Sequence, residues 1–225
     1  DTIDSCVTFL NDKIDGATTT NDDYKNDVWT SDLTSYNWTE HTPTNATIPS
    51  ERHNHSSILY DRKMVMFGGQ EKKDSGYKND VWTFDLTSYV WMQLTTYGTK
   101  PSARYNHSSI LYDGKMVMFG GYDDDSQGYK NDVWTLNLTS YVWTQLTTSD
   151  TKPSARYNHS SILYDGKMVM FGGYDDDSQG YKNDVWTLNL TSDLTSYNWT
   201  EHTTTSDTKP SARYNHSSIL YDGKM

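Results

Sequence analysis

A stretch of 40 residues occurs twice in this chain, letter for letter, and it constrains the fold more than any other feature. Pro101–Ser140 returns as Pro153–Ser192, a looser copy begins at Pro49, and a further copy begins at Pro210. The arginine at the fourth position of each copy recurs after 52, 52 and 57 residues. A period of about 50 residues predicts a propeller or array in which no repeat buries its apolar faces alone.

The composition favours an ordered β protein with a core of large aromatic residues. Only 34% of the residues are hydrophobic, which by itself is typical of disordered chains. However, 18 Tyr and 8 Trp recur at fixed positions of the repeat, and each can bury a large area.

Charge and hydropathy bear on the partners. The formal net charge of −11 repels phosphate backbones and anionic lipid headgroups, so we expect neither nucleic acid nor a membrane as a partner. No apolar run approaches the length needed to span a bilayer. The chain starts and stops within repeats and is expected to be a fragment, so missing targeting signals carry no weight.

Two features bear on the compartment and point in opposite directions. Cys6 is the single cysteine, which rules out an internal disulfide framework and favours a reducing, cytoplasmic location. An extracellular glycoprotein is the alternative, because the chain has nine Asn-x-Ser/Thr sequons. Duplication of one unit also multiplies chance sequons. The nine are Asn37, Asn45, Asn54, Asn106, Asn137, Asn158, Asn189, Asn198 and Asn215.

Each unit is expected to form four short strands, which in the unit beginning at Pro101 span residues 106–112, 115–119, 132–138 and 141–146. Asp113 and Gly114 suit a two-residue hairpin turn with positive φ angles. The run MVMF is typical of a strand covered on both faces, and the polar stretch YDDDSQGYKN is expected to be a loop. On the third strand, Val133 and Thr135 are expected on one face and Trp134, Leu136 and Leu138 on the other. Such meanders, repeated radially, form propeller blades. Near the start of the chain, residues 6–10 are expected to form a strand and residues 11–23 a loop.

The unit resembles a kelch repeat. Apolar residues run into a Gly-Gly doublet, then come an aromatic-bearing strand and a later Trp. The doublets are Gly68-Gly69, Gly120-Gly121 and Gly172-Gly173, and the later tryptophans are Trp38, Trp91, Trp143 and Trp199. The chain departs from the family where a Tyr usually precedes that Trp, because the residues there are Ser31, Phe84, Leu136 and Leu188. An extra segment at Ser192–Ser196 is a second departure.

The resemblance implies an all-β, kelch-type β-propeller of four-stranded antiparallel blades over residues 1–225. A partial first blade is expected at 1–48, blades at 49–100, 101–152 and 153–209, and the start of a next or ring-closing blade at 210–225. About four blades' worth of sequence either closes into a small ring or, as we expect, forms an open part of a larger one.

One Arg/Tyr pair in each unit is the candidate partner site. In the family this position lies at the mouth of the propeller, on the face that often holds ligands. Arg suits bidentate capture of carboxylates, and Arg and aromatic residues dominate binding hot spots. A structural Arg that bonds the backbone of a neighbouring blade would recur with the same regularity. The candidates are Arg52, Arg104, Arg156 and Arg213 with Tyr105, Tyr157 and Tyr214, and the looser copy has His53 in the Tyr position.

Two places in the sequence contain residue types that can bind a metal ion. A ring of imidazoles can bind metal, but a structural hydrogen bond made once per blade fits the symmetry better. The imidazoles in question are those of His55, His107, His159 and His216. The loops at 123–128 and 175–180 begin as calcium loops do, yet the twelfth place of the first is Trp134 instead of a bidentate Glu. We therefore predict no metal site and no cofactor.

No nucleophile motif and no phosphate-binding loop is present, so we expect no enzyme activity. The expected function is a protein-protein interaction module, a scaffold or adaptor that binds a protein or peptide through its inter-blade loops. The arginines favour an acidic ligand and the Asp loops a basic one, and the sequence leaves this choice open. The alternatives are a propeller enzyme or carbohydrate-binding protein whose active loops lie outside this stretch, and a structural spacer.

Overall fold

Every regular element is a β-strand in the part of the chain that the computed structural model describes. The described residues are 5–8, 25–71, 76–123, 128–148, 151–175, 178, 180–190, 197–203 and 208–225. The loop predicted at 11–23 lies outside them.

Three four-stranded antiparallel sheets repeat the same order, each strand pairing with the next. The first contains β5 (Ser56–Tyr60), β6 (Lys63–Phe67), β8 (Val81–Asp85) and β9 (Trp91–Leu94). The second contains β11 (Ser108–Tyr112), β12 (Lys115–Phe119), β15 (Val133–Asn137) and β16 (Trp143–Leu146). The third contains β18 (Ser160–Tyr164), β19 (Lys167–Phe171), β22 (Val185–Asn189) and β23 (Trp199–His202). These blades confirm the predicted four-stranded units, and the strand ends agree to within two residues.

A three-stranded sheet precedes these blades. It contains β1 (Ser5–Thr8), β2 (Trp29–Asp32) and β3 (Trp38–Glu40), with β1 antiparallel to β2. Because β2 and β3 match β8 and β9 in sequence, β1 takes the place that β6 has in a complete blade. The strand predicted at 6–10 is therefore present as far as Thr8, and its last two residues are outside the described ones.

Short sheets join the loops at one end of the blades, and one prediction was wrong here. They are β4 (Arg52–His53) with β7 (Gln70–Glu71), β10 (Arg104–Tyr105) with β13 (Tyr122–Asp123) and β14 (Gly128–Tyr129), and β17 (Arg156–Tyr157) with β20 (Tyr174–Asp175) and β21 (Gly180–Tyr181). The stretch at 122–131 was expected to be a loop. It starts instead as a hairpin in which Tyr122 pairs with Tyr129, because their rings pack 5.4 Å apart.

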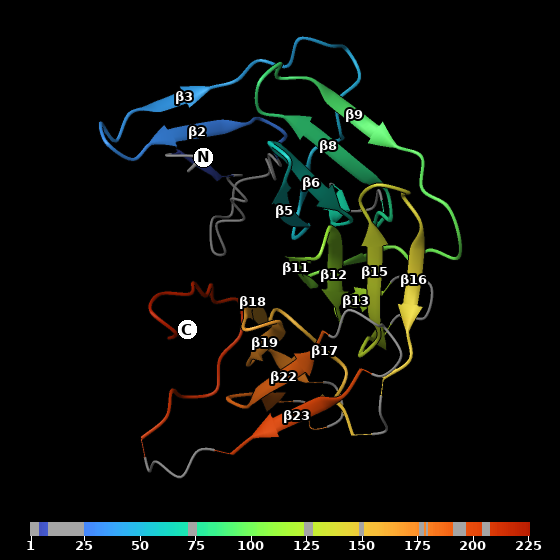
Figure 1. The fold of residues 1–225 in the computed structure, drawn as a ribbon, viewed down its shortest axis with the longest axis vertical. Helices are drawn as coiled ribbons and strands as arrows, with labels where there is room; N and C mark the ends of the chain where they lie inside the picture. Colours follow the sequence, from blue (N-terminus) through green and yellow to red (C-terminus); the bar gives the residue numbers. More distant parts are fainter. Residues whose placement is uncertain are drawn as a thin grey trace, which may run out of the picture.

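The blades follow one another around an open arc (Figure 1). Strands β5, β11 and β18 line its inner side, and β9, β16 and β23 lie outermost. The arc opens between the sheet that holds β2 and the C-terminal segment 208–225. That segment follows the third blade, where the Asn215 amide donates to the Asn158 carbonyl at 2.9 Å. The blades of this chain therefore form the open arrangement that was expected, and that this arc is part of a larger ring stays a prediction.

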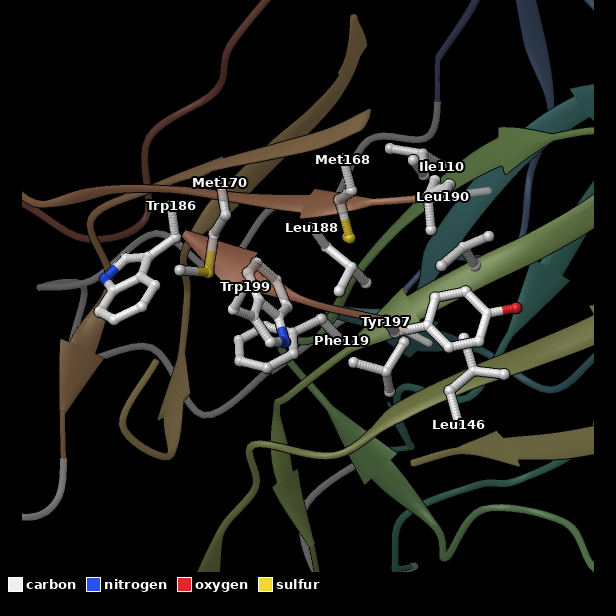
Figure 2. Close-up of a cluster of buried hydrophobic side chains, with 12 residues drawn as sticks. Ile110, Phe119, Leu146, Met168, Met170, Trp186, Leu188, Leu190, Tyr197 and Trp199 are labelled. Atoms are coloured by element: carbon white, nitrogen blue, oxygen red, sulfur yellow. The ribbon is translucent and has the colours of Figure 1, made fainter. Parts of the chain in front are cut away.

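The core lies between the blades. Met116 and Met118 of β12 pack against the preceding blade, whereas Val117 and Phe119 pack against the following one. Figure 2 shows this second interface, where Phe119 lies against Trp199 of β23 at a ring distance of 4.9 Å. Covering β12 on both faces explains why MVMF is apolar throughout. The predicted partition of β15 is also confirmed, since Val133 belongs to one interface and Trp134, Leu136 and Leu138 to the other.

Candidate functional site

The chain direction gathers the candidate residues at one end of the blades. In a four-strand meander, the link from the fourth strand to the next blade and the link from the second strand to the third leave at the same end. The short sheets of β10 and β17 tie these two links together. We call this end the loop face, and its described residues are 49–55, 68–71, 76–80, 101–107, 120–123, 128–132, 153–159, 172–175, 178 and 180–184.

The arginines of the loop face are buried in ion pairs. Arg104 is 1% exposed, and its two terminal nitrogens donate to both oxygens of Asp132 at 2.7 and 2.9 Å. The same guanidinium donates to the carbonyls of Gly120 and Ser102 and to the Ser102 hydroxyl. All five of its N–H groups therefore have partners within the blade.

The same clamp recurs in the two flanking blades. Arg52 pairs with Asp80 and Arg156 with Asp184, and these arginines are 4% and 1% exposed. Burial by itself raises the pKa of Asp132, but the hydrogen bonds and charge of Arg104 outweigh it and leave that pKa below its usual value. Both side chains of the ion pair therefore stay charged, and the net charge of the pair is zero.

Among the described residues, the fourth arginine has no such clamp. Arg213 lies in the C-terminal segment, is exposed, and its side chain donates to the carbonyl and hydroxyl of Ser211. Its backbone nevertheless bonds the preceding blade, because the Gly173 amide donates to its carbonyl at 2.9 Å. The corresponding backbone bond joins Gly121 to Arg156. Three of the four arginines thus bond a neighbouring blade through their own backbone carbonyls, whereas the three clamped guanidinium groups bond within their own blade. That the four arginines contact a partner stays a prediction, and the clamp engages the side chains of three of them.

The Gly-Gly doublets allow this close contact between blades. Gly120 and Gly121 have φ angles of +68° and +96°, which disfavour other residues. A Cβ atom at Gly120 would lie 2.8 Å from the Arg156 carbonyl oxygen, and one at Gly121 would lie 2.8 Å from the Tyr105 carbonyl oxygen. The doublet therefore holds the loop face of one blade against the next.

Two of the repeated histidines, His159 and His216, form hydrogen bonds between inner strands. Ser108 of β11 lies 2.8 Å from Nε2 of His159 in the next blade and 2.7 Å from the Ser161 hydroxyl. The Ser160 hydroxyl contacts His216 in the same way, at 2.8 Å. Burial lowers the pKa of His159 to about 3, and the charge of Arg156 adds to the shift. These imidazoles are neutral connectors between blades.

The described residues offer no arrangement for metal chemistry. Among them, no group of three or more His, Cys, Asp or Glu side chains converges on a point where a metal ion could bind. Nor does the described part of the chain contain a helix with the length and apolarity of a membrane span.

Two cavities lie away from the loop face. One of about 550 Å³ is lined by side chains that include Lys115, Asn137 and Thr144. Another of about 250 Å³ lies between the first and second complete blades, beside Tyr60, Asp61 and Thr139. Neither contains any of the predicted site residues.

The predicted tyrosines belong to a larger row of aromatic rings. Tyr105 packs against Tyr77 of the preceding blade at 4.7 Å, and Tyr157 stacks on Tyr129 at 5.0 Å with an angle of 6° between the rings. Five members of this row were not predicted from the sequence. They are Tyr77, Tyr122, Tyr129, Tyr174 and Tyr181, and a signal was available, because the letters GGY and GYKND recur at fixed places in the repeat.

The fold, the inter-blade core and the repeated loop face define a kelch-repeat β-propeller. Residues 14–193 match the family described as the FBX42 beta-propeller domain, and the chain belongs to this family. The resemblance to kelch repeats noted from the Gly-Gly doublets and tryptophans is thereby confirmed.

The similar proteins carry the same repeat in larger chains. Over 169 residues, this chain is 32% identical to Leucine-zipper-like transcriptional regulator 1 homolog from Drosophila melanogaster, which covers 71% of this chain and 17% of that protein. Over 209 residues it is 27% identical to Kelch domain-containing protein 3 from Homo sapiens, covering 88% and 54%. The chain thus spans from about a sixth to about half of the length of these relatives.

A solved structure of low sequence identity has the same fold. The structure of YjhT superposes with a TM-score of 0.67 at 15% identity, covering 83% of this chain and 61% of the other. At that identity the likeness concerns the fold alone.

Proposed function

We propose that this chain is a protein-binding module, without catalytic activity, whose loop face contacts a protein or peptide partner. The observation that carries the proposal is the row of partly exposed tyrosines, seven on the loop face and one, Tyr214, on the C-terminal segment that packs against Tyr181. Six of its eight members are half-buried, and Tyr181 and Tyr214 are 53% and 43% exposed.

Tyrosine is well suited to this role. Its ring supplies a large contact area with few rotatable bonds, so little conformational entropy is lost on binding. Clustered exposed aromatic side chains on a soluble protein mark interaction sites. Membership in a kelch-repeat family is consistent with such a module. A structural spacer, by contrast, needs no aromatic row on one face.

The test is selection of binding peptides from a random phage-displayed library on the immobilised 225-residue chain. A double variant, Tyr122→Ala with Tyr174→Ala, removes two rings of the loop face. The matched control is Tyr36→Ala, since Tyr36 is 77% exposed in the turn between β2 and β3, at the opposite end of a blade.

We expect the selected peptides to lose about tenfold or more in affinity for the double variant and to bind the Tyr36→Ala protein as they bind the parent, because hot-spot rings each contribute more than 1 kcal/mol. Both proteins must first show the parental near-ultraviolet circular dichroism. If no peptide is enriched, or if enriched peptides bind the double variant equally well, the loop face is not the binding surface.

A further inference from the structure

The tyrosines form one uninterrupted path across two blade junctions and on to the C-terminal segment. The centroids of successive rings are between 4.7 and 5.7 Å apart. The path alternates between contacts that cross a junction and contacts inside a blade. We call this path the tyrosine row. In order, its members are Tyr77, Tyr105, Tyr122, Tyr129, Tyr157, Tyr174, Tyr181 and Tyr214.

Two contacts of the tyrosine row differ in geometry from the others. Tyr129 stacks on Tyr157 with 6° between the ring planes, and Tyr181 stacks on Tyr214 at 4.9 Å with 19° between them. The ring pairs inside the second and third complete blades are instead inclined at 57° to 71°. Two pairs of phenols are therefore held face to face, each across the edge of a blade.

Phenols that lie face to face are suited to oxidative coupling. A tyrosine that loses one electron and its phenolic proton becomes a phenoxyl radical, whose unpaired electron lies in the π system and partly on the ring carbons ortho to the oxygen. Because these orbitals project from the ring faces, they overlap between two stacked rings and overlap poorly between inclined ones. Two such radicals join by one carbon–carbon bond between ortho carbons, and the hydrogens of these carbons move to the oxygens and restore both phenols.

Exposure and proton loss favour the pair at the C-terminal end of the row. Tyr181 and Tyr214 are 53% and 43% exposed, so an oxidant reaches both rings and both phenolic protons can leave to water. Tyr105 and Tyr157 are half-buried, and burial raises the pKa of each, which disfavours loss of the phenolic proton there. Electrons pass readily between aromatic rings in contact, so a radical formed elsewhere in the row can move to the exposed pair.

We propose that Tyr181 and Tyr214 are a site of oxidative modification, at which hydrogen peroxide and a haem peroxidase form a dityrosine bond. The two tyrosines lose two electrons and two protons in all, and these reduce one hydrogen peroxide to two waters. The bond fixes the C-terminal segment where its backbone already contacts the third complete blade, since the Gly173 amide donates to the Arg213 carbonyl. This chemistry is independent of the proposed binding role.

The first test is treatment of the 225-residue chain with hydrogen peroxide and a haem peroxidase at low protein concentration. We expect dityrosine fluorescence in the monomer and an intact monomer mass that is lower by two hydrogen atoms. The linked protein is also expected to unfold at a higher urea concentration, because a cross-link constrains the unfolded chain. Absence of dityrosine from the monomer, or its presence in covalent dimers alone, overturns the inference.

Phenylalanine variants locate the bond, since Phe keeps the ring and has no phenolic proton to lose. Tyr181→Phe and Tyr214→Phe are each expected to lose most of the dityrosine of the monomer. The matched control is Tyr221→Phe, because Tyr221 lies in the same segment and is 79% exposed but is not a member of the tyrosine row. We expect this variant to couple as the parent does. A parental yield in Tyr214→Phe overturns the inference, and so does an equal loss in Tyr221→Phe, which would mean that exposure decides and stacking does not.

A further variant separates the two stacked pairs. Peptide mapping after trypsin cannot do so, because the peptides that carry Tyr129 and Tyr181 have the same sequence, and so do those that carry Tyr157 and Tyr214. We expect Tyr157→Phe to retain most of the dityrosine. Its loss in that variant would place the bond between Tyr129 and Tyr157 and overturn the assignment to the exposed pair.

Discussion

One arginine position of the repeat has two environments in this chain. Arg104 and Arg213 occur in the same local sequence, PSARYNHSSILYDGKM, yet Arg104 is clamped by Asp132 and Arg213 is exposed. The partner of Arg104, Asp132, lies 28 residues downstream, just before the third strand of the blade. The recurring Asp was visible in the sequence, but its ion pair was not, because nothing in a local pattern reports a contact over that distance.

The two arginines are therefore expected to differ strongly in their contribution to stability. Arg104→Met leaves Asp132 and the Gly120 carbonyl without their partner, and we expect a loss of about 3–5 kcal/mol in the free energy of unfolding. Arg213→Met is expected to stay within about 0.5 kcal/mol. Urea unfolding monitored by tryptophan fluorescence measures both, and equal losses would contradict the clamp.

The buried histidines predict acid sensitivity. The pKa of His159 is lowered by burial to about 3, and that of His107 lies well below its usual range for the same reason. Below about pH 6.5 the unfolded chain binds protons that the folded chain excludes, so stability falls as the pH falls from 6.5 towards the folded pKa. Each such histidine contributes a slope of about 1.4 kcal/mol per pH unit in this window.

We expect His159→Gln to flatten this dependence. The free energy of unfolding between pH 7 and 4 should have a slope smaller by about one proton than in the parent chain, because one excluded proton is removed. The pKa values of Asp132 and Asp184 in the clamps are lowered. Protonation of these carboxylates therefore lowers the free energy of unfolding further once the pH falls below the usual Asp pKa of 3.8. A parental slope in the His159→Gln protein would show that this histidine is not held neutral.

At the scale of elements, the hairpin between the first two strands of each blade shows where the repeat is strained. In three copies the second turn residue is Gly, with φ of +67° to +68°. In the looser copy the same place is Arg62, with φ of +56°. The turn was predictable from the Asp-Gly pair, and the positive φ angles agree with it.

Arg62→Gly is expected to stabilise the chain. A left-handed conformation costs a non-glycine residue about 1–2 kcal/mol, and the greater freedom of unfolded glycine offsets about 0.5–1 kcal/mol of the gain. We expect a net increase of about 0.5–1 kcal/mol, measured by urea unfolding, and a similar decrease for Gly114→Arg at the matched turn. A loss of stability in Arg62→Gly would mean that the arginine side chain contributes more than the strain costs.

The long strands were predictable and the short ones were not. The continuous apolar run MVMF extends over four residues and the alternation on β15 over five, and both predictions proved correct. Strands β13 and β14 have two residues each, which is too short for any period to appear. Their pairing depends on tyrosine rings that meet across the hairpin, and this also explains why five of the eight tyrosines in the row of aromatic rings were not predicted.

At the scale of the whole molecule, residues at the same repeat position differ in burial because the segments packed against them differ. Phe119 and Phe171 are the same repeat position, but Phe119 is fully buried against the third complete blade and Trp199. Phe171 is half-buried and faces the C-terminal segment, with its ring 5.2 Å from that of His216. The repeat period was enough to predict the blades, whereas the open arc depends on how successive blades pack against one another.

The inter-blade core therefore predicts unequal costs for equal substitutions. Phe119→Ala should lower the free energy of unfolding by about 3–5 kcal/mol, and Phe171→Ala by clearly less, because less of that side chain is removed from water. Met118→Ala and Met170→Ala form the matched control, since both side chains are fully buried against a preceding blade and should cost the same, about 2–5 kcal/mol. Urea unfolding of the four proteins decides the matter. If the Met variants agree and the two Phe variants also lose the same amount of stability, the face of the third complete blade that carries Phe171 is covered as well as the faces between blades. The stability of the array would then not depend on packing against the nearest blade, which contradicts this prediction.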